Sequence, residues 1–531
     1  MSRMIAAVVA AVAAAAGGAN AQTLSPYASA GEQQAAMTDG RVTSEQLVAA
    51  YLQRIERIDR AGPKLNSVIV LNRHALADAR KLDAERRAGK IRGPLHGVTI
   101  LLKDNIETTD GGATTAGSLA LAANVPQRDA PLVTRLTDAG AVVLGKANLS
   151  EWANFRSTRS ISGWSAVGGL VRNPYGLDRT ACGSSAGSGA AVAAGLAALA
   201  IGTETNGSIA CPAAINGVVG LKPTVGLVSR THIVPLSPEQ DTAGPMTRTV
   251  ADAAAVLSVI AGTDPFDPAT RDADTHKSNY LAALDRGALK GARIGVWAPN
   301  KGRSPPADAV FEAALQALRT QGAVLIDVHG PDAATMARIS ALESDCLRTE
   351  FKAALNAYLA TTPAVVRART LDELIAFNKA EPRELALFGQ EIFEEAARHP
   401  PITDAGYLAK RNEARKLARG ALDKMLGENR LDSIVVTGNA PAAIVDPVYG
   451  ARFFGPSTTL PAVSGYPHLV VPAGNVSGLP MAISFYGSAW SEAKLLAYGY
   501  AFEQATMARR EPEFLPNVAA RPEFARAYDP R

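Results

Sequence analysis

The chain has 531 residues, of which 47% are hydrophobic and 20% are charged. This composition excludes a disordered protein and supplies enough apolar surface for a large core. Lysine and arginine together number 54, against 50 for aspartate and glutamate. The resulting net charge of +4 does not indicate nucleic-acid binding. Three cysteines exclude a small scaffold held by many disulfides, and stability must come from packing.

The first 21 residues differ from the rest of the chain. They hold one charge, at Arg3, followed by an apolar run over 5–16 and a small-residue motif at 19–21. This order predicts a secretory signal peptide that is removed after residue 21. A membrane anchor is the alternative, but the run is shorter than the roughly 20 apolar residues that span a bilayer. We therefore expect a mature chain, 22–531, that is periplasmic or secreted and does not bind membranes.

Helical and strand patterns alternate after this segment. Thr43 and Gln46 have the spacing of a capping box, which predicts a helix over 44–59. Short apolar runs indicate strands, and charged stretches with apolar residues at helical spacing indicate helices. In chain order they predict a strand at 68–71, a helix at 73–90, a strand at 98–102, a helix at 132–139 and a strand at 141–144. Such alternation is typical of an α/β fold in which helices cover a largely buried sheet.

The rest of the chain contains two unusual stretches. From 188 to 201 almost every residue is Ala, Gly, Val or Leu, which predicts a helix buried on all sides. The segment 307–430 is charged, helical in pattern and poor in strand runs, so we expect a helical insertion or cap over one edge of the sheet. Strand patterns return at 433–436, 469–471 and 481–485, before a helix over 491–506. Because no internal repeat or low-complexity linker divides the chain, we expect one large domain.

Two motifs suggest functions that their surroundings exclude. Residues 140–146, GAVVLGK, have the spacing of a phosphate-binding loop, but Ala147 stands where a magnesium-binding Ser or Thr is required. Residues 183–187, GSSAG, match the nucleophile elbow of serine esterases, yet a turn-rich sequence precedes them instead of the required strand. The seven histidines are scattered singly, so no metal or cofactor site is predicted.

Two glycine-flanked serines and a lysine are left as candidates for nucleophilic catalysis. Ser208 follows a short apolar strand and a loop of small residues, whose N–H groups can converge on one point as in an oxyanion hole. Ser184 precedes the predicted buried helix, where the positive end of the helix dipole favours an alkoxide. Lys103 ends an apolar strand, and burial there would lower its pKa from ~10.4 toward ~7 to 8, so that it can act as a base.

Each candidate also has a purely structural interpretation. Ser184 and Ser185 are suited to cap the helix that follows them. Lys103 is also placed to form an ion pair with the adjacent Asp104. The residues alone leave these alternatives open.

Long motifs of the chain resemble those of the amidase signature family. They are GVTILLKDNI around Lys103, the stretch from CGSSAGSG to LKPTVGLVSR over 182–230, DTAGPMTRTVADAA from Asp241, and GLPMAISFYGSAWSEAKLLAYGYAFEQ near the C-terminus. LSEWANFR, SISGWSA and GTETNGSI are similar to motifs of the bacterial peptide amidases within that family. The resemblance covers most of the mature chain. It implies a single large α/β domain with a mixed central β-sheet covered by helices on both faces.

The resemblance also implies roles for individual residues. Ser208 would be the nucleophile, Ser184 the bridging serine and Lys103 the base, with a cis peptide bond between Gly183 and Ser184. Ser185 would contact these three residues without contacting the substrate. Amide hydrolysis would then pass through an acyl-enzyme, whose tetrahedral oxyanion is held by backbone N–H groups. The residues implied for this oxyanion hole are Thr205, Asn206, Gly207 and Ser208.

Two residues depart from the common family pattern. Asn206 stands where many members have Gly, and Glu204 stands where many have Asp. Asn adopts positive φ more readily than most residues, and only its N–H is needed, so we expect an intact oxyanion hole. The Asn206 side chain is expected to narrow or polarise the pocket.

Other residues near the serines leave alternatives open. Cys182 and Cys211 lie within three residues of Ser184 and Ser208, and either a disulfide or two buried free thiols fits an exported protein. Four residues in sequence rich in Gly, Ser and Asn are candidates for the wall of a cleft that binds a peptide-like substrate, with ordinary packing as the alternative. They are Trp152, Asn154, Phe155 and Trp164.

Together with the resemblance, these residues predict an exported amide hydrolase without a cofactor. The expected substrates are C-terminally amidated peptides or amino-acid amides, and the expected products are the free acid and ammonia. One alternative is a broader amidase of aryl or aliphatic amides, and another is a catalytically silent amide-binding protein on the same scaffold. The signal segment disfavours the relatives that modify charged tRNA, so we expect no nucleic-acid partner.

Overall fold

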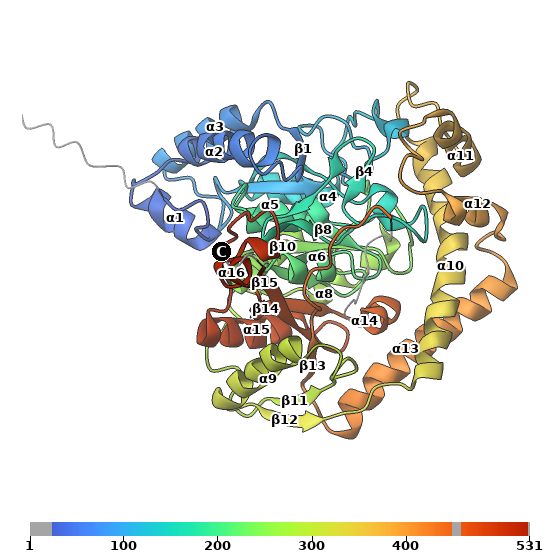
Figure 1. Cartoon of the computed structure of the whole chain (residues 1–531). Coiled ribbons are helices and arrows are strands. Elements are labelled where there is room, and N and C mark those ends of the chain that lie inside the picture. The colour runs from blue at the N-terminus through green and yellow to red at the C-terminus, as the bar shows by residue number, and fades with distance from the viewer. Residues whose placement is uncertain (1–23, 449–457, 529–531) are drawn as a thin grey trace, which may run out of the picture.

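The computed structural model describes residues 24–448 and 458–528, so the predicted signal segment lies outside the described residues. Its centre is an 11-stranded sheet in the order β1-β3-β2-β8-β10-β9-β14-β15-β13-β11-β12. In chain order the strands are β1 (Val68–Leu71), β2 (Thr99–Lys103), β3 (Val142–Ala147), β8 (Leu199–Glu204), β9 (Val219–Lys222), β10 (Thr242–Thr247), β11 (Arg293–Val296), β12 (Val324–Asp327), β13 (Ser433–Thr437), β14 (His468–Val476) and β15 (Leu479–Tyr486). The sheet forms the core of the molecule (Figure 1).

Both pairing directions occur in this sheet. Strand β2 pairs in parallel with β3 and β8, and β11 pairs in parallel with β12 and β13. The remaining neighbours pair antiparallel. Two small hairpins, β4 (Trp164–Ser165) with β5 (Gly169–Leu170) and β6 (Arg172–Asn173) with β7 (Gly176–Thr180), lie outside the sheet. The predicted α/β fold with a mixed central sheet is therefore confirmed.

Helices cover both faces of the sheet. Leu469 and Val470 are successive residues of β14, so their side chains point to opposite faces. Helix α15 (Glu492–Thr506) packs on Leu469 through Gly499, whereas α6 (Ala210–Ile215) packs over Gly220, the register partner of Val470. Other helices of the body are α1 (Ala30–Thr38), α2 (Ser44–Arg54), α3 (Ala75–Arg87), α4 (Pro131–Asp138), α7 (Val250–Ile260), α8 (Ala273–His276), α9 (Pro305–Thr320), α14 (Thr459–Ser464) and α16 (Pro522–Tyr528).

The first long helix begins as predicted. Thr43 and Gln46 form the capping box, in which each side chain accepts the other residue's backbone N–H. The α-helix ends at Arg54 and continues as a π-helical turn, Ile55–Arg60. Short 3-10 helices lie at Leu119–Leu121, Glu151–Asn154, Pro268–Thr270 and Val518–Ala520. Within the described ranges, no helix has the length and hydropathy needed to cross a membrane.

The helix predicted over 188–201 is wrong in extent. Helix α5 (Ala186–Ala193) is buried throughout, but the chain turns at Gly195, whose φ is +67°, and Leu199 begins strand β8. Both elements are fully buried, so neither has the polar positions whose spacing distinguishes a helix from a strand. One uniform apolar run therefore holds a helix, a turn and a strand.

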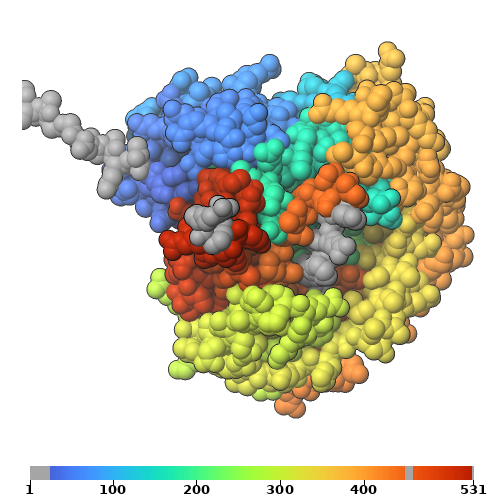
Figure 2. Space-filling model, viewed as in Figure 1, coloured from blue at the N-terminus to red at the C-terminus, as the bar shows by residue number. Residues whose placement is uncertain are grey.

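The segment 307–430 contains most of α9, strand β12 and four further helices. These are α10 (Ala333–Ala360), α11 (Leu371–Ala380), α12 (Glu391–Arg398) and α13 (Ala405–Glu428). Strand β12 forms an edge of the sheet, in a segment whose sequence pattern is poor in strand runs. Helices α10 to α13, which we call the cap, run along one side of the molecule in yellow and orange (Figures 1 and 2). Cap residues Phe351 and Phe393 share a hydrophobic cluster with Trp152 of the body.

Candidate active site

Lys103 ends strand β2 and is fully buried. Its Nζ lies 2.7 Å from Ser184 Oγ and donates to the carbonyl oxygen of Thr203 at 3.1 Å and to its Oγ1 at 2.8 Å. Thr203 is within reach because β8 pairs in parallel with β2. Burial lowers the pKa of Lys103 from 10.5 to about 7, against the opposing charges of Asp241 and Glu204. A lysine with this pKa can accept a proton at neutral pH.

Asp104 is not the partner of Lys103. Its Oδ1 lies 3.1 Å from Nζ of Lys146, and both side chains are fully buried. Lys146 belongs to strand β3, so residues 140–146 run into the sheet and do not form a phosphate-binding loop. The ion-pair interpretation of Lys103 is therefore wrong, and the rejection of the phosphate-binding loop is confirmed.

Ser184 and Ser185 lie in the turn between Cys182 and helix α5. The peptide bond between Gly183 and Ser184 is cis, as the resemblance implied. The Ser185 side chain makes no capping hydrogen bond to α5; its Oγ donates to the carbonyl oxygen of Thr203 at 3.1 Å and accepts the Thr203 N–H at 3.2 Å. Because Ser184 faces Lys103 and Ser185 binds strand β8, the capping interpretation is wrong for both serines.

Ser208 lies in the turn that joins β8 to α6. Its carbonyl oxygen accepts the N–H of Ser185 at 3.1 Å, which ties together the two serine-containing loops. Gly207 takes the left-handed conformation that the turn requires, with φ at +79°. The Glu204 carboxylate accepts the N–H groups of Ile209 and Ala210 at 2.8 and 2.9 Å. This unusual glutamate therefore fixes the start of the helix behind Ser208.

Ser208 lines a cavity of about 380 Å³. The side chain is buried except for 8% of its surface, so the cavity is its access to solvent and substrate. Of the other implied oxyanion-hole residues, Asn206 and Gly207 line the same cavity, while Thr205 lines a neighbouring cavity of about 200 Å³. The complete lining of the larger cavity is Ala153, Asn154, Ser157, Thr158, Ser160, Ser162, Cys182, Gly183, Asn206, Gly207, Ser208, Cys211, Ile392 and Thr458.

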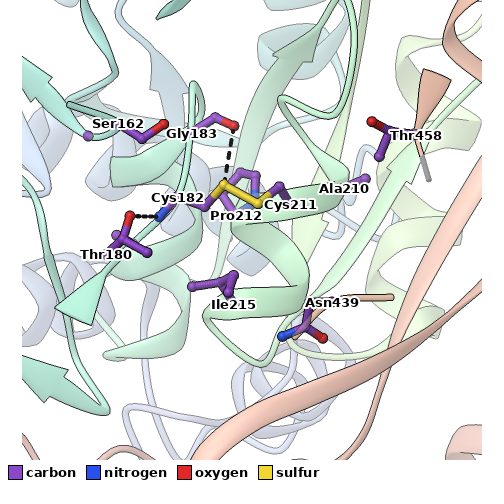
Figure 3. Close-up of a disulfide and its surroundings, with 12 residues drawn as sticks. Ser162, Thr180, Cys182, Gly183, Ala210, Cys211, Pro212, Ile215, Asn439 and Thr458 are labelled. Carbon is purple, nitrogen blue, oxygen red and sulfur yellow. Dashed lines mark hydrogen bonds between the residues drawn. A yellow bond between two sulfur atoms is a disulfide. The ribbon is translucent and has the colours of Figure 1, made fainter. Parts of the chain in front are cut away.

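A disulfide joins Cys182 to Cys211 beside this cavity (Figure 3). It links the residue before Gly183 to helix α6, which follows Ser208. The alternative of two free thiols is therefore wrong, and the bridge is a second connection between the serine-containing loops. Cys346 is free and buried in helix α10.

The Asn206 side chain contacts the cap and Thr458. Its Nδ2 donates to both carboxylate oxygens of Glu343, at 2.9 and 3.1 Å, and its Oδ1 accepts from Thr458 Oγ1 at 2.6 Å. Gly207, and not Asn206, carries the positive φ of the turn. The departure from glycine at this position thus adds a contact between the loop and helix α10.

The four proposed substrate-binding residues fall into two groups. Asn154 lines the cavity and donates to Ser162 Oγ at 2.7 Å. The three aromatic residues pack edge to face against phenylalanines, with ring centroids 5.2 to 6.0 Å apart. The pairs are Trp152 with Phe393, Phe155 with Phe351, and Trp164 with Phe388. Packing therefore accounts for the aromatic residues, and Asn154 is the one of the four that lines the cavity.

Three residues that touch the site stand outside the predicted set: Thr203, Gln240 and Glu343. Thr203 follows the apolar run of β8, and pairing that strand with β2 would have placed it beside Lys103. Glu343 lies 137 residues from its partner Asn206, in a helix whose local pattern carries no mark of catalysis. The described residues contain no group of three or more His, Cys, Asp or Glu side chains that could hold a metal ion.

The fold and this site agree with the comparison to known proteins. The model of the family named Amidase matches residues 46–496, and the chain belongs to that family. It is an enzyme that hydrolyses amide C–N bonds. A probable amidase of Arabidopsis thaliana is 40% identical to it over 90% of each chain.

Solved structures narrow the relationship. A structure described as the peptide amidase PAM with the competitive inhibitor chymostatin is 51% identical, with a TM-score of 0.87 over 92% of this chain and 100% of that one. The native peptide amidase from Stenotrophomonas maltophilia is 50% identical, with a TM-score of 0.86 over 92% of this chain and 99% of that one. The resemblance to peptide amidases is therefore confirmed.

Proposed function

We propose that this protein is an exported peptide amidase, which releases ammonia from C-terminally amidated peptides or amino-acid amides. The observation that carries the catalytic part is the 2.7 Å contact between Nζ of buried Lys103 and Ser184 Oγ, next to a cavity lined by Ser208. A lysine whose pKa is lowered to about 7 can serve as the base for a hydroxyl nucleophile, and no histidine is among the described residues that line the cavity. The similarity to the two peptide amidases supports the substrate class.

In the proposed reaction, neutral Lys103 takes a proton from Ser184 while Ser184 takes one from Ser208. The Ser208 oxygen attacks the amide carbon, and N–H groups of the loop 205–208 stabilise the oxyanion that forms. The C–N bond then breaks as the relay returns a proton to the nitrogen, and ammonia leaves. Water attacks the acyl-enzyme by the same relay, which releases the free acid and restores Ser208.

The cavity walls favour a peptide-like substrate. Beside Ser208 they carry the hydroxyl groups of 157, 158, 160 and 162 and the amide of Asn154. The hydroxyls of 157, 158 and 160 already donate within the protein, but the buried Oδ1 of Asn154 has no hydrogen-bond partner. It can accept an N–H group of a peptide backbone, whereas a benzamide ring offers no such donor. We therefore expect peptide amides to be hydrolysed faster than small aromatic amides.

Export is supported by two features of different kinds. The sequence of 1–21 has the order of a secretory signal. The disulfide between Cys182 and Cys211 forms and persists in oxidising compartments such as the periplasm. Detection of the cleaved protein in a periplasmic or culture-medium fraction tests this part, and an uncleaved protein in the cytosol would overturn it.

Ammonia release tests the activity. A short peptide amide and benzamide are compared at pH 6 to 9, with the mature protein and its Ser208→Ala variant. Fast turnover of the peptide amide, lost in the variant, is the expected result. Turnover of benzamide alone would make the protein a broader amidase with the same catalytic residues. A folded protein that releases no ammonia from either compound would indicate an amide-binding protein.

A further inference from the structure

Helix α10 of the cap reaches the loop 205–208 through one buried carboxylate. Glu343 is 5% exposed, and its oxygens accept both contacts from Asn206 Nδ2. One oxygen also accepts from Gln240 Nε2 at 2.7 Å. The carboxylate thus holds the side chain of the residue that directly precedes the Gly207-Ser208 turn.

Gln240 extends this contact to Thr205, the residue before Asn206. Its Nε2 also lies 3.3 Å from the carbonyl oxygen of Thr205, and its Oε1 accepts from Arg411 Nη1 at 2.6 Å. Arg411 belongs to helix α13 and forms a buried ion pair with Glu350 of α10. Residues 205 and 206 are therefore both connected to the cap, through side chains that are themselves fixed by hydrogen bonds.

We propose that Glu343 is a positioning residue for amide hydrolysis, which acts through Asn206 to hold the loop 205–208 in its reactive geometry. The inference rests on the proposed role of this loop as the oxyanion hole. It gives the cap a part in catalysis besides lining the cavity through Ile392, because the carboxylate that orients the loop comes from the cap and not from the sheet.

The size of the effect follows from what an oxyanion hole requires. Its N–H groups must lie about 2.7–3.1 Å from the oxyanion, and loss of one such donor typically lowers kcat by 10²–10³-fold. Removal of Glu343 releases Asn206 Nδ2 but leaves the contact of Asn206 Oδ1 with Thr458 and every backbone N–H in the protein. We therefore expect kcat to fall by roughly ten- to a hundredfold in Glu343→Ala, with KM within about threefold of the wild type, because the effect is on the transition state.

A double-mutant cycle tests whether Glu343 acts through Asn206. The variants are Glu343→Ala, Asn206→Ala and the double variant, each assayed for ammonia release from the peptide amide. Asn206→Ala retains its backbone N–H and is expected to lose a similar share of kcat. If Glu343 and Asn206 act as one unit, kcat of the double variant falls no further than kcat of the more impaired single variant. Losses in kcat that multiply would overturn the proposal, and so would a rise in KM without a fall in kcat.

Two further variants separate positioning from general stability. Glu413→Gln breaks the exposed ion pair with Arg338, which also joins α10 to α13, and is expected to leave kcat unchanged. Glu343→Gln keeps the volume and one oxygen acceptor, so it should retain more activity than Glu343→Ala. Glu343→Gln also replaces Glu343→Ala in the double-mutant cycle if the alanine variant does not fold. A glutamine variant no more active than a folded alanine variant would contradict a role in orientation.

The Ser208→Ala variant distinguishes the two proposals. If that variant keeps its activity, the proposed function is wrong and the Glu343 proposal fails with it. If Ser208→Ala is inactive while the effects at 343 and 206 multiply, only the positioning role of Glu343 is overturned.

Discussion

The pH dependence of amide hydrolysis tests the proposed base. With a pKa of about 7, Lys103 is about 10% neutral at pH 6 and about 90% neutral at pH 8. Only the neutral amine accepts a proton, so kcat/KM is expected to rise about tenfold per pH unit below pH 6.5 and to level off near pH 8. A profile that is flat from pH 5 to 8, or that still rises steeply at pH 9, would refute the assignment.

Substitutions of the lysine separate its charge from its basicity. Lys103→Met has no proton acceptor, and Lys103→Arg holds a cation that stays protonated at every accessible pH. Both are expected to lower kcat/KM by roughly 10³-fold or more. Lys222→Met is the matched control, because Lys222 is also fully buried, with its pKa lowered to about 8. The control variant should keep the rise in activity between pH 6 and 8; its loss there would assign the titration to Lys222.

The stability of Lys103→Met shows whether activity is lost without unfolding. The fall from 10.5 to about 7 corresponds to about 4 kcal/mol against folding at pH 7, because the unfolded chain holds a proton that the folded chain binds weakly. The unfolded chain binds more protons between pH 7 and 10.5, so stability rises with pH in this window. Lys103 makes three hydrogen bonds, each worth about 1 kcal/mol. The methionine variant is therefore expected to be at least as stable as the wild type at pH 7 in urea unfolding.

Two further predictions concern the surroundings of this base. Asp241→Asn removes the charge that most strongly raises the pKa of Lys103, so the rise of kcat/KM should move to lower pH. Asp252→Asn, at another buried aspartate, should leave the pH of this rise unchanged. Equal shifts in the two variants would contradict the assigned effect of Asp241 on Lys103. Cys182→Ala with Cys211→Ala removes the disulfide and should lower the free energy of unfolding by ~2 to 4 kcal/mol. Reduction of the wild type should reproduce that loss, and an unchanged urea midpoint would show that the bridge does not stabilise the fold.

The burial of Lys103, the proposed base, was predictable because its environment is local in sequence. The apolar run before Lys103 predicts a buried strand, and burial of a lysine at the end of such a strand disfavours its charged form. Whether Lys103 pairs with Asp104 could not be predicted in the same way, because Asp104 pairs instead with Lys146 of a different strand. The two serines were found because glycine-rich loops flank them, while their roles came from the resemblance.

The boundary between α5 and β8 was not predictable from the same kind of pattern. A segment that is buried on every side has no polar positions, so neither the helical nor the strand period appears in its sequence. Gly195 is the one local sign of a turn, and glycine also occurs inside α5. The correct boundary depends on the pairing of β8 with β2 and β10, which lie far away in the chain.

The contacts between the cap and the site were also not predictable from local sequence patterns. Trp152, Phe155 and Trp164 occur in loop-like sequence, which suggested a substrate cleft, but their partners are phenylalanines of the segment 351–393. Glu343 lies on a helix with charged residues around it, and only the fold brings it against Asn206. A carboxylate buried in this way costs free energy unless its hydrogen bonds are made. Its donors are the side-chain amides of Asn206, in the loop 205–208, and of Gln240, so a displacement of α10 here breaks the contacts to the loop and leaves the buried carboxylate without these donors.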